Sequence, residues 1–376
     1  MTSKEAFLAL NLLPGIGPIR VHRLLEAFSQ PQDILSTSEK DLQQIPGIGR
    51  EMARSIRDWE NLIDLAEEQR RMADHGITTI TLEDSHYPPA LREIHDPPFL
   101  LYVKGQIEPC DAAAVGVVGS RRMTHYGREQ ARKLSFQLAR AGFTIISGLA
   151  RGIDTAAHEA ALAAEGRTIA VLGSGIGNIY PAENDVLANR IAENGAVISE
   201  FPVLYVPDKQ SFPLRNRIVS GMSEGLLVIE APGRSGSLIT ANQALEQGRT
   251  VFAVPGPIDR PTSEGCNRLI RQGATLVTTA RDVIDDLSTG LNSLNLGFAA
   301  PEHPSEHPSE KPSPTLESLD DQQTRILEEL EKGEQTIDTI SEAISVPAGA
   351  VSASLLQLEM KSLVKQLPGK YFTKLI

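Results

Sequence analysis

The stretch Val-Gly-Val-Val-Gly-Ser-Arg, residues 115–121, decides how the fold of this chain is read. Its β-branched residues predict a buried strand of a parallel sheet, and the strand ends at Gly119, Ser120 and Arg121. Glycine lets a ligand approach the backbone closely, and arginine adds a positive charge. Ligands of open α/β sheets bind outside the carboxyl ends of the strands. The stretch therefore predicts an anion site, although a plain turn with a solvated arginine also explains it.

Further apolar runs follow this strand and alternate with amphipathic segments. The predicted strands are 144–147, 168–172, 196–199, 226–229, 251–254 and 275–277, and the predicted helices include 128–141, 155–164, 186–194 and 239–247. Continuous apolar strands separated by crossover helices are typical of parallel sheets that are covered on both faces. We therefore predict an α/β fold with a Rossmann-like, doubly wound parallel sheet.

Charge is distributed unevenly along the 376 residues. The formal net charge of -12 argues against a surface coated in basic residues for bulk nucleic-acid binding. Between Asp111 and Ser288, however, 18 basic residues balance 18 acidic ones, and 16 of the 18 are arginines. The planar guanidinium group suits phosphate better than the point charge of lysine. These counts indicate one concentrated anion site in an acidic protein.

Residues 1–75 contain an internal repeat. Leu-Pro-Gly-Ile-Gly at 13–17 recurs as Ile-Pro-Gly-Ile-Gly at 45–49, and an amphipathic run follows each copy. This pattern resembles the helix-hairpin-helix motif, whose hairpin N–H groups face a DNA phosphate, and it predicts a small all-α, SAM-like domain. The segment holds 9 basic and 12 acidic residues. Contact with a protein is therefore favoured, and direct contact with DNA remains the alternative.

We assign residues 76–288 to the main domain, 289–318 to a linker and 319–376 to a terminal domain. The prolines after His75 predict extended chain and a strand over 99–103. Proline, serine and glutamate dominate the linker, which cannot bury a core. The terminal domain shows three helical runs and a short hairpin, the winged-helix pattern. Its third helix has almost no cations, which favours a protein partner over reading of duplex DNA.

The cysteines and the N-terminus set further expectations. Cys110 and Cys266 form no C-x-x-C pair, so neither a disulfide framework nor a zinc site is indicated. The first residues lack the apolar core of a signal peptide, and no apolar run reaches membrane-spanning length. We expect a cytoplasmic protein without a metal or a cofactor.

Glycines, hydroxyl groups and arginines gather at the ends of the predicted strands. Before a helix such residues expose backbone N–H groups, which form a phosphate site. Several such turns with several arginines predict a groove that follows the backbone of a single-stranded nucleic acid, with Phe212 or Tyr180 stacking on a base. Residues 212–217 are interpreted as a loop. The candidate phosphate-binding residues are Gly119, Ser120, Arg121, Ser147, Gly148, Arg151, Phe212, Arg215, Asn216, Arg217, Ser235, Gly236 and Ser237.

Taken together these blocks resemble the DprA (Smf) family of DNA-processing proteins over essentially the whole main domain. The blocks are Val-Gly-Ser-Arg at 118–121, Ser-Gly-Leu-Ala-Arg-Gly-Ile-Asp at 147–154, Tyr-Pro at 180–181, Ser-Glu at 199–200, Phe-Pro-Leu-Arg-Asn-Arg at 212–217 and Ser-Gly-Ser-Leu-Ile-Thr at 235–240. The flanking domains also look like those of longer members.

The resemblance implies a protein without catalysis that protects incoming single-stranded DNA in natural transformation. It further implies a homodimer formed through the Rossmann domain and help in loading the recombinase RecA. The phosphate-pocket role carries over to Gly119, Ser120 and Arg121, and the role of groove arginines to Arg215 and Arg217. Members of the family commonly have a basic residue where this chain has Val186. The groove is then weaker there, or another cation such as Arg190 replaces that residue.

Enzymatic alternatives lack required residues. Gly173, Gly175 and Gly177 do not have the spacing of a dinucleotide-binding loop. Residues 232–240 resemble the motif of the LOG phosphoribohydrolases, but Thr240 stands where that family has its catalytic glutamate. Asp154 is interpreted as a helix cap or an arginine partner, and Glu230 as a buried partner of an arginine.

Overall fold

The computed structural model describes residues 1–293, 321–330, 333, 335–344, 346–360, 363–367 and 371–374. The chain divides into two compact units, Met1–Leu296 and Gly297–Ile376. Among the helices of the described residues, none is long and apolar enough to cross a membrane.

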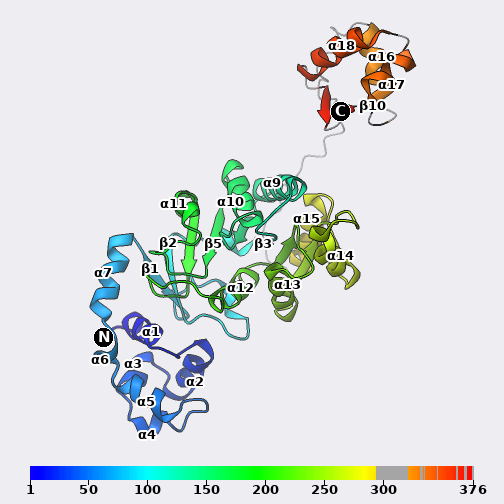
Figure 1. Cartoon of the computed structure of the whole chain (residues 1–376). Coiled ribbons are helices and arrows are strands. Elements are labelled where there is room, and N and C mark those ends of the chain that lie inside the picture. The colour runs from blue at the N-terminus through cyan, green and yellow to red at the C-terminus, as the bar shows by residue number, and fades with distance from the viewer. Residues whose placement is uncertain are drawn as a thin grey trace. The chain divides into compact units, whose positions relative to one another are not determined.

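A nine-stranded sheet forms the centre of the first unit (Figure 1). Its order is β1-β2-β6-β5-β4-β3-β7-β8-β9. The pairs β1–β2 and β2–β6 are antiparallel, and the other pairs are parallel. The strands are β1 (Thr78–Thr81), β2 (Leu100–Gly105), β3 (Ala114–Val118), β4 (Thr144–Ser147), β5 (Thr168–Leu172), β6 (Gly195–Ser199), β7 (Gly225–Val228), β8 (Thr250–Ala253) and β9 (Thr275–Leu276).

Helices cover both faces of this sheet. The helices of the main domain are α8 (Pro89–Arg92), α9 (His125–Arg140), α10 (Ile153–Ala163), α11 (Asp185–Glu193), α12 (Ser211–Gly221), α13 (Gly236–Glu246), α14 (Glu264–Arg271) and α15 (Ala280–Ser293), with short 3-10 helices at Pro109–Ala112, Ala182–Asn184 and Pro261–Ser263. Helices α9, α10 and α15 share one apolar core with the sheet, and α12, α13 and α14 share another on the opposite face (Figure 1). Side chains alternate between the two faces of a strand, so Val115 and Val117 of β3 belong to the first core, and Ala114 and Val118 to the second.

Two glycine hairpins organise the N-terminal helices. These helices are α1 (Ser3–Leu12), α2 (Pro18–Phe28), α3 (Pro31–Ser36), α4 (Glu39–Leu42), α5 (Arg50–Arg57), α6 (Trp59–Leu62) and α7 (Leu65–His75). Gly15 and Gly47 adopt φ values of +78° and +88°, which only glycine reaches without strain. Arg20 joins the two hairpins, since its Nη1 donates to the Gly15 carbonyl at 2.8 Å and its Nε to the Gly47 carbonyl at 3.2 Å.

The N-terminal helices and one edge of the sheet share a single hydrophobic core. Phe7 of α1 packs against Phe99, with ring centroids 6.0 Å apart, and Tyr102 of β2 is fully buried in the same cluster. The hydroxyl of Tyr102 donates to Oδ1 of Asn11 at 3.3 Å, and Nδ2 of Asn11 donates to the Glu200 carbonyl at 3.0 Å. The helices are therefore fixed to the sheet by apolar packing and hydrogen bonds together.

The second unit has the winged-helix arrangement. Its elements are α16 (Asp321–Leu330), β10 (Gln335–Thr336), α17 (Ile337–Ile344), α18 (Ala348–Met360), β11 (Val364–Leu367) and β12 (Tyr371–Lys374). The three strands pair in the order β10-β12-β11, and the helices bury one apolar cluster that includes Ile326, Ile340 and Leu355. The sequence missed β10, which has two residues and therefore no readable alternation.

The predicted fold class is confirmed, with three differences in detail. The sheet is parallel over β3 to β9, but β1 and β2 add an antiparallel edge. Helix α15 continues to Ser293, so the predicted linker over 289–318 begins within a helix, and the part of it after residue 293 lies outside the described residues. Residues 212–217 belong to α12 and not to a loop.

Candidate nucleic-acid interface

The candidate site lies where the order of the parallel strands reverses. The chain passes from β3 through β4 and β5 to β6, and then returns to place β7 on the other side of β3. The turn after β3 and the turn after β7 therefore meet at the carboxyl ends of neighbouring strands. The Ser120 N–H donates to the Glu230 carbonyl at 2.7 Å, which joins the two turns. Such a switch point is where open α/β sheets bind their ligands.

A cavity of about 610 Å³ opens at this switch point, and we call it the phosphate cavity. Its walls come from the turns after β3, β4 and β7, from the start of α10, and from the first half of α12 with the loop before it. Five cationic side chains and one carboxylate line it, namely Arg121, Arg122, Lys209, Arg215, Arg234 and Asp154. The predicted residues Gly119, Ser120, Phe212, Asn216, Ser235, Gly236 and Ser237 also line it. The excess of positive charge is large for a protein whose net charge is -12.

Arg121 is an exposed cation of the site that lies next to an aromatic ring. It is exposed, and its guanidinium carbon lies 5.0 Å from the centre of the Phe212 ring. Phe212 in turn packs against Tyr180, with ring centroids 5.8 Å apart. A cation beside two partly exposed rings can bind a phosphate and stack on a base together.

Arg215 forms the buried floor of the same cavity. It is 4% exposed, its Nη1 donates to the Gly148 and Val171 carbonyls, and burial lowers its pKa to about 10. A Cβ on Gly148 would lie 2.5 Å from this guanidinium, so any other residue there would have to displace Arg215. Asp154 accepts from the N–H groups of Gly148 and Ala150 at 3.1 and 3.3 Å. Burial raises the pKa of Asp154 to about 6, although Arg215 opposes that shift.

Ser235 caps helix α13 at the far wall. Its hydroxyl accepts from the Ser237 N–H at 3.4 Å and lies 2.7 Å from the Ser237 hydroxyl. Ser120 is 6% exposed, and its hydroxyl accepts from the Arg122 N–H at 3.1 Å. Both serines therefore shape turns, and the start of α13, whose free N–H groups and positive dipole end favour anions, lines the phosphate cavity.

Arg217 does not line the phosphate cavity, contrary to the prediction. It is 4% exposed on the other side of α12, where its guanidinium pairs with Glu200 and lies 3.1 Å from Asp96. Residues two apart on a helix are separated by about 200° around its axis, so Arg215 and Arg217 cannot face the same groove. The predicted grouping of Arg217 with Arg215 is not found, because 212–217 is a helix and not a loop, and contact of Arg217 with DNA stays a prediction.

Other predicted residues also have internal partners. Ser147 is fully buried, and its hydroxyl donates to the Val117 carbonyl at 2.6 Å, so it braces two strands. Arg151 lies with Phe212, Tyr180 and Gly148 around a smaller cavity, but it pairs with Glu183. Both groups of that pair are exposed, so a ligand phosphate can replace the carboxylate at little cost. Val186 is 71% exposed, and Arg190 is exposed one turn later.

Two buried titratable residues close to the site, Glu230 and His158, are held by internal contacts. Glu230 is 3% exposed and accepts from the N–H and the hydroxyl of Thr124, at 3.0 and 3.2 Å, so its partner is a helix cap and not the arginine that we expected. His158 is fully buried against the Thr168 hydroxyl at 2.7 Å, and burial lowers its pKa to about 3. Neither residue lines the phosphate cavity.

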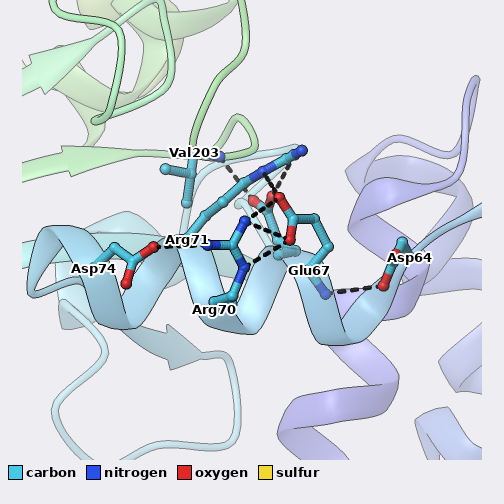
Figure 2. A network of polar contacts seen from close by, with 7 residues as sticks. Asp64, Glu67, Arg70, Arg71, Asp74 and Val203 are labelled. Atoms are coloured by element: carbon cyan, nitrogen blue, oxygen red, sulfur yellow. Dashed lines mark hydrogen bonds and ion pairs between the residues drawn. The ribbon is translucent and has the colours of Figure 1, made fainter.

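A buried carboxylate of helix α7 holds the loop that leads into α12. Figure 2 shows the polar network of this helix, in which Glu67 binds Arg70 and Arg71. Glu68 is 2% exposed and accepts from the Val203 N–H at 2.7 Å. The Val203 carbonyl accepts from the Gly177 N–H at 2.8 Å, which ties this loop to the one before Tyr180. The N-terminal helices thus hold the loop that precedes α12 and, through it, the loop that precedes Tyr180.

Sequence reasoning missed Lys209 and Arg234 as lining residues. Each adjoins a predicted motif, since Lys209 precedes Phe212 by three residues and Arg234 directly precedes Ser235. The adjoining motifs could therefore have indicated that these two residues line the site. Glu68 offered none, because its partner Val203 lies 135 residues away along the chain.

The fold and this cavity define an α/β protein of the doubly wound class with a cation-lined cavity at the topological switch point of its sheet. Residues 78–288 match the family described as DNA recombination-mediator protein A, residues 310–370 match the DprA winged helix domain, and residues 7–58 match the SAM-like helix-hairpin-helix tandem. The chain belongs to the DNA recombination-mediator protein A family, whose members include the DprA and Smf proteins.

Relatives match over most of their length. Protein Smf of Synechocystis is 34% identical over 395 residues, which cover 99% of each chain. Protein Smf of Escherichia coli is 42% identical over 78% of this chain and 76% of its own. The X-ray structure of DNA processing protein A from Streptococcus pneumoniae superposes with a TM-score of 0.67 at 36% identity, covering 76% of this chain and 98% of that chain. These likenesses support a DNA-processing role in recombination.

A second solved structure concerns ligand binding directly. It describes the single-stranded DNA binding mode of DNA processing protein A from Helicobacter pylori. That chain is 32% identical to this one, with a TM-score of 0.51, and the match covers 57% of this chain and 97% of the other.

Proposed function

We propose that this protein binds single-stranded DNA without catalysis, with the phosphate backbone running through the phosphate cavity. The observation that carries the proposal is the composition of that cavity: five cations face one carboxylate at the switch point of the sheet. Single-stranded DNA supplies consecutive phosphates for the cations and bases for the ring of Phe212. The relative from Helicobacter pylori, whose structure concerns binding of single-stranded DNA, supports the same ligand.

The lining residues favour binding over hydrolysis. Asp154, the one carboxylate of the cavity, accepts two backbone hydrogen bonds and lies beside Arg215. Thr240 occupies the position of the hydrolase glutamate, and its hydroxyl donates to the Gly236 carbonyl at 3.5 Å. Release of free base from nucleoside monophosphates would contradict this part of the proposal.

The wider role rests on the family. We infer that the protein protects incoming single-stranded DNA, helps to load the recombinase RecA and forms a homodimer through its Rossmann-like domain. A protein with this task works in the cytoplasm. The winged-helix unit and the hairpins then serve contacts with proteins or DNA that modulate this activity.

A salt titration tests the proposal. The affinity for a labelled oligothymidylate should fall with salt, with a log–log slope of about −0.7 for each neutralised phosphate. Binding should show little preference between strands of different sequence, because backbone contacts carry no sequence information. Absence of binding, or an affinity that does not depend on salt, would refute it.

A further inference from the structure

Helix α12 separates the phosphate cavity from a second one. This second cavity has a volume of about 720 Å³ and lies between the first glycine hairpin, the loop after β6 and the side of α12 that carries Leu214 and Arg217. Ligand pockets in proteins commonly enclose about 300–1,000 Å³. It therefore has room for a ligand of the size of a nucleotide, and we call it the hairpin cavity.

The walls of the hairpin cavity are largely apolar and include two stacked rings. Phe201 and Tyr205 lie with ring centroids 4.5 Å apart and an interplanar angle of 14°. Both side chains are half-buried, so part of the aromatic surface faces the cavity. Leu214 of α12 also lines the cavity and is 47% exposed. A flat ring inserted here would find apolar and aromatic surface.

Two cations lie on the hairpin side. Arg20 and Arg23 line the cavity, and neither pairs with a carboxylate among the described residues. They donate to the hairpin carbonyls of Gly15, Gly47 and Pro46. Each guanidinium has five N–H groups, so both keep donors and a full positive charge for an anion.

The third arginine of the hairpin cavity is Arg217, which Asp96 and Glu200 neutralise. Its Nη1 and Oε1 of Glu200 are buried and have no hydrogen-bond partner among the described residues. The edge of a nucleobase carries both donors and acceptors, and a small shift of these side chains would let it use both atoms.

We propose that the hairpin cavity takes one or more nucleotides of the same DNA strand, with a base against Phe201 and Tyr205 and its phosphate beside Arg20 and Arg23. This inference rests on the proposed function and extends the binding site across α12. A helix with its side chains is about 10–12 Å across, so a strand that leaves the phosphate cavity over α12 reaches the hairpin cavity within a few nucleotides.

Variants of Tyr205 and Leu214 test the inference in the full chain. The Tyr205 hydroxyl lies 3.3 Å from Asp208, and its backbone carbonyl accepts from the Gly175 N–H, a bond that any side chain preserves. Tyr205→Ala removes a stacking surface, while Tyr205→Phe keeps it and is the matched control. Leu214→Glu places a negative charge in the cavity from an exposed position.

The measurement is the affinity for oligothymidylates of increasing length. Short strands should bind all variants as they bind the unaltered protein, because they fill only the phosphate cavity. Longer strands should bind Tyr205→Ala and Leu214→Glu on the order of tenfold more weakly, since stacking on one base accounts for about this factor. Tyr205→Phe should match the unaltered protein at every length.

Cross-linking provides a second measurement. A strand carrying 4-thiothymidine should cross-link to the peptide that contains Phe201 and Tyr205, and only when the strand is long enough to pass α12.

This inference is overturned if Tyr205→Ala and Leu214→Glu bind strands of every length as tightly as the unaltered protein does and no cross-links to 201–205 form. If Arg121 is still required for binding in that case, the proposed function stands. If replacing Arg121 has no effect either, the proposed function fails and this inference fails with it.

Discussion

The two cavities beside α12 are similar in size but differ in how their arginines are used. In the phosphate cavity Arg121 is exposed, and one carboxylate faces five cations. In the hairpin cavity the deepest arginine, Arg217, is held by Asp96 and Glu200. Arg215 and Arg217 are two residues apart and equally buried, yet they belong to different cavities. The comparison teaches that equal burial and similar cavity volume do not fix the partners of a guanidinium, which are backbone carbonyls for Arg215 and two carboxylates for Arg217.

The strongest test of this contrast is the stability of Arg217→Met. The substitution leaves Asp96 and Glu200 without their cation, and breaking a buried ion pair in this way costs about 3–5 kcal/mol. Urea unfolding followed by circular dichroism should show a clear fall in the midpoint. The double variant Arg217→Met/Glu200→Gln should recover part of it. An unchanged midpoint for the single variant would mean that Arg217 is not a structural cation.

Reversal of the exposed charge should abolish binding with no effect on the fold. Arg121→Glu replaces an attraction to phosphate by a repulsion, and we expect the affinity for single-stranded DNA to fall on the order of a hundredfold or more. The thermal midpoint should stay within about 2 °C, because surface substitutions usually change stability little. Arg140→Glu, an exposed charge reversal at the end of α9, is the matched control and should bind normally. Unchanged affinity in folded Arg121→Glu would remove this residue from the site.

The Glu68 contact links the two cavities, since the loop it holds lines one and leads to the other. Glu68→Ala leaves the buried Val203 N–H without an acceptor, which costs about 1–3 kcal/mol. We expect a lower unfolding midpoint and an affinity for single-stranded DNA about fivefold weaker, because Phe212 loses its fixed position. Glu68→Gln retains an acceptor oxygen and should restore most of both. If stability falls and the affinity is unchanged, the contact between Glu68 and Val203 does not position Phe212.

The smallest expected effect comes from the carboxylate of the phosphate cavity. The pKa of Asp154 is raised to about 6, so its proton is bound as the pH falls from 7 toward 5. Protonation removes the negative charge that faces the DNA phosphates, and the affinity should therefore rise a few-fold over this range. Both hydrogen bonds of Asp154 end on Oδ2, so Asp154→Asn can keep them. A pH profile that is equally steep in Asp154→Asn would assign the effect to other groups.

The same raised pKa affects stability with a defined sign. The folded chain binds this proton more tightly than the unfolded chain, whose aspartate has the usual pKa of 3.8. The contribution of this proton to the stability of the folded chain is complete below pH 3.8 and is lost as the pH rises through about 6.

Strands β3 to β7 could be predicted well because each is buried on both faces and ends at a glycine or a polar turn. The predicted limits of β4 and β5 are those of the structure. The turn at Gly119–Arg121 and the turn at Ser235–Ser237 could each be predicted to bind an anion. Their proximity depends on the pairing of β3 with β7, which local sequence does not encode.

The role of Arg217 could not be predicted for a related reason. Its partners Asp96 and Glu200 come from distant segments, and residues 212–217 were interpreted as a loop where a helix has already begun at Ser211. Pro213 lies in the first turn of α12, where proline is well tolerated. The hairpin repeat, in contrast, was readable because both copies need glycine at a left-handed position.

The core shared by the N-terminal helices and the sheet restricts how the family can gain or lose domains. Phe99, Leu100 and Tyr102 are at most 2% exposed because the helices cover them. A relative without these helices would present the same positions to water, so natural selection should replace them with polar residues or cover them with another segment. The presence of the helical region in a genome-encoded homologue should therefore correlate with apolar residues at these three positions.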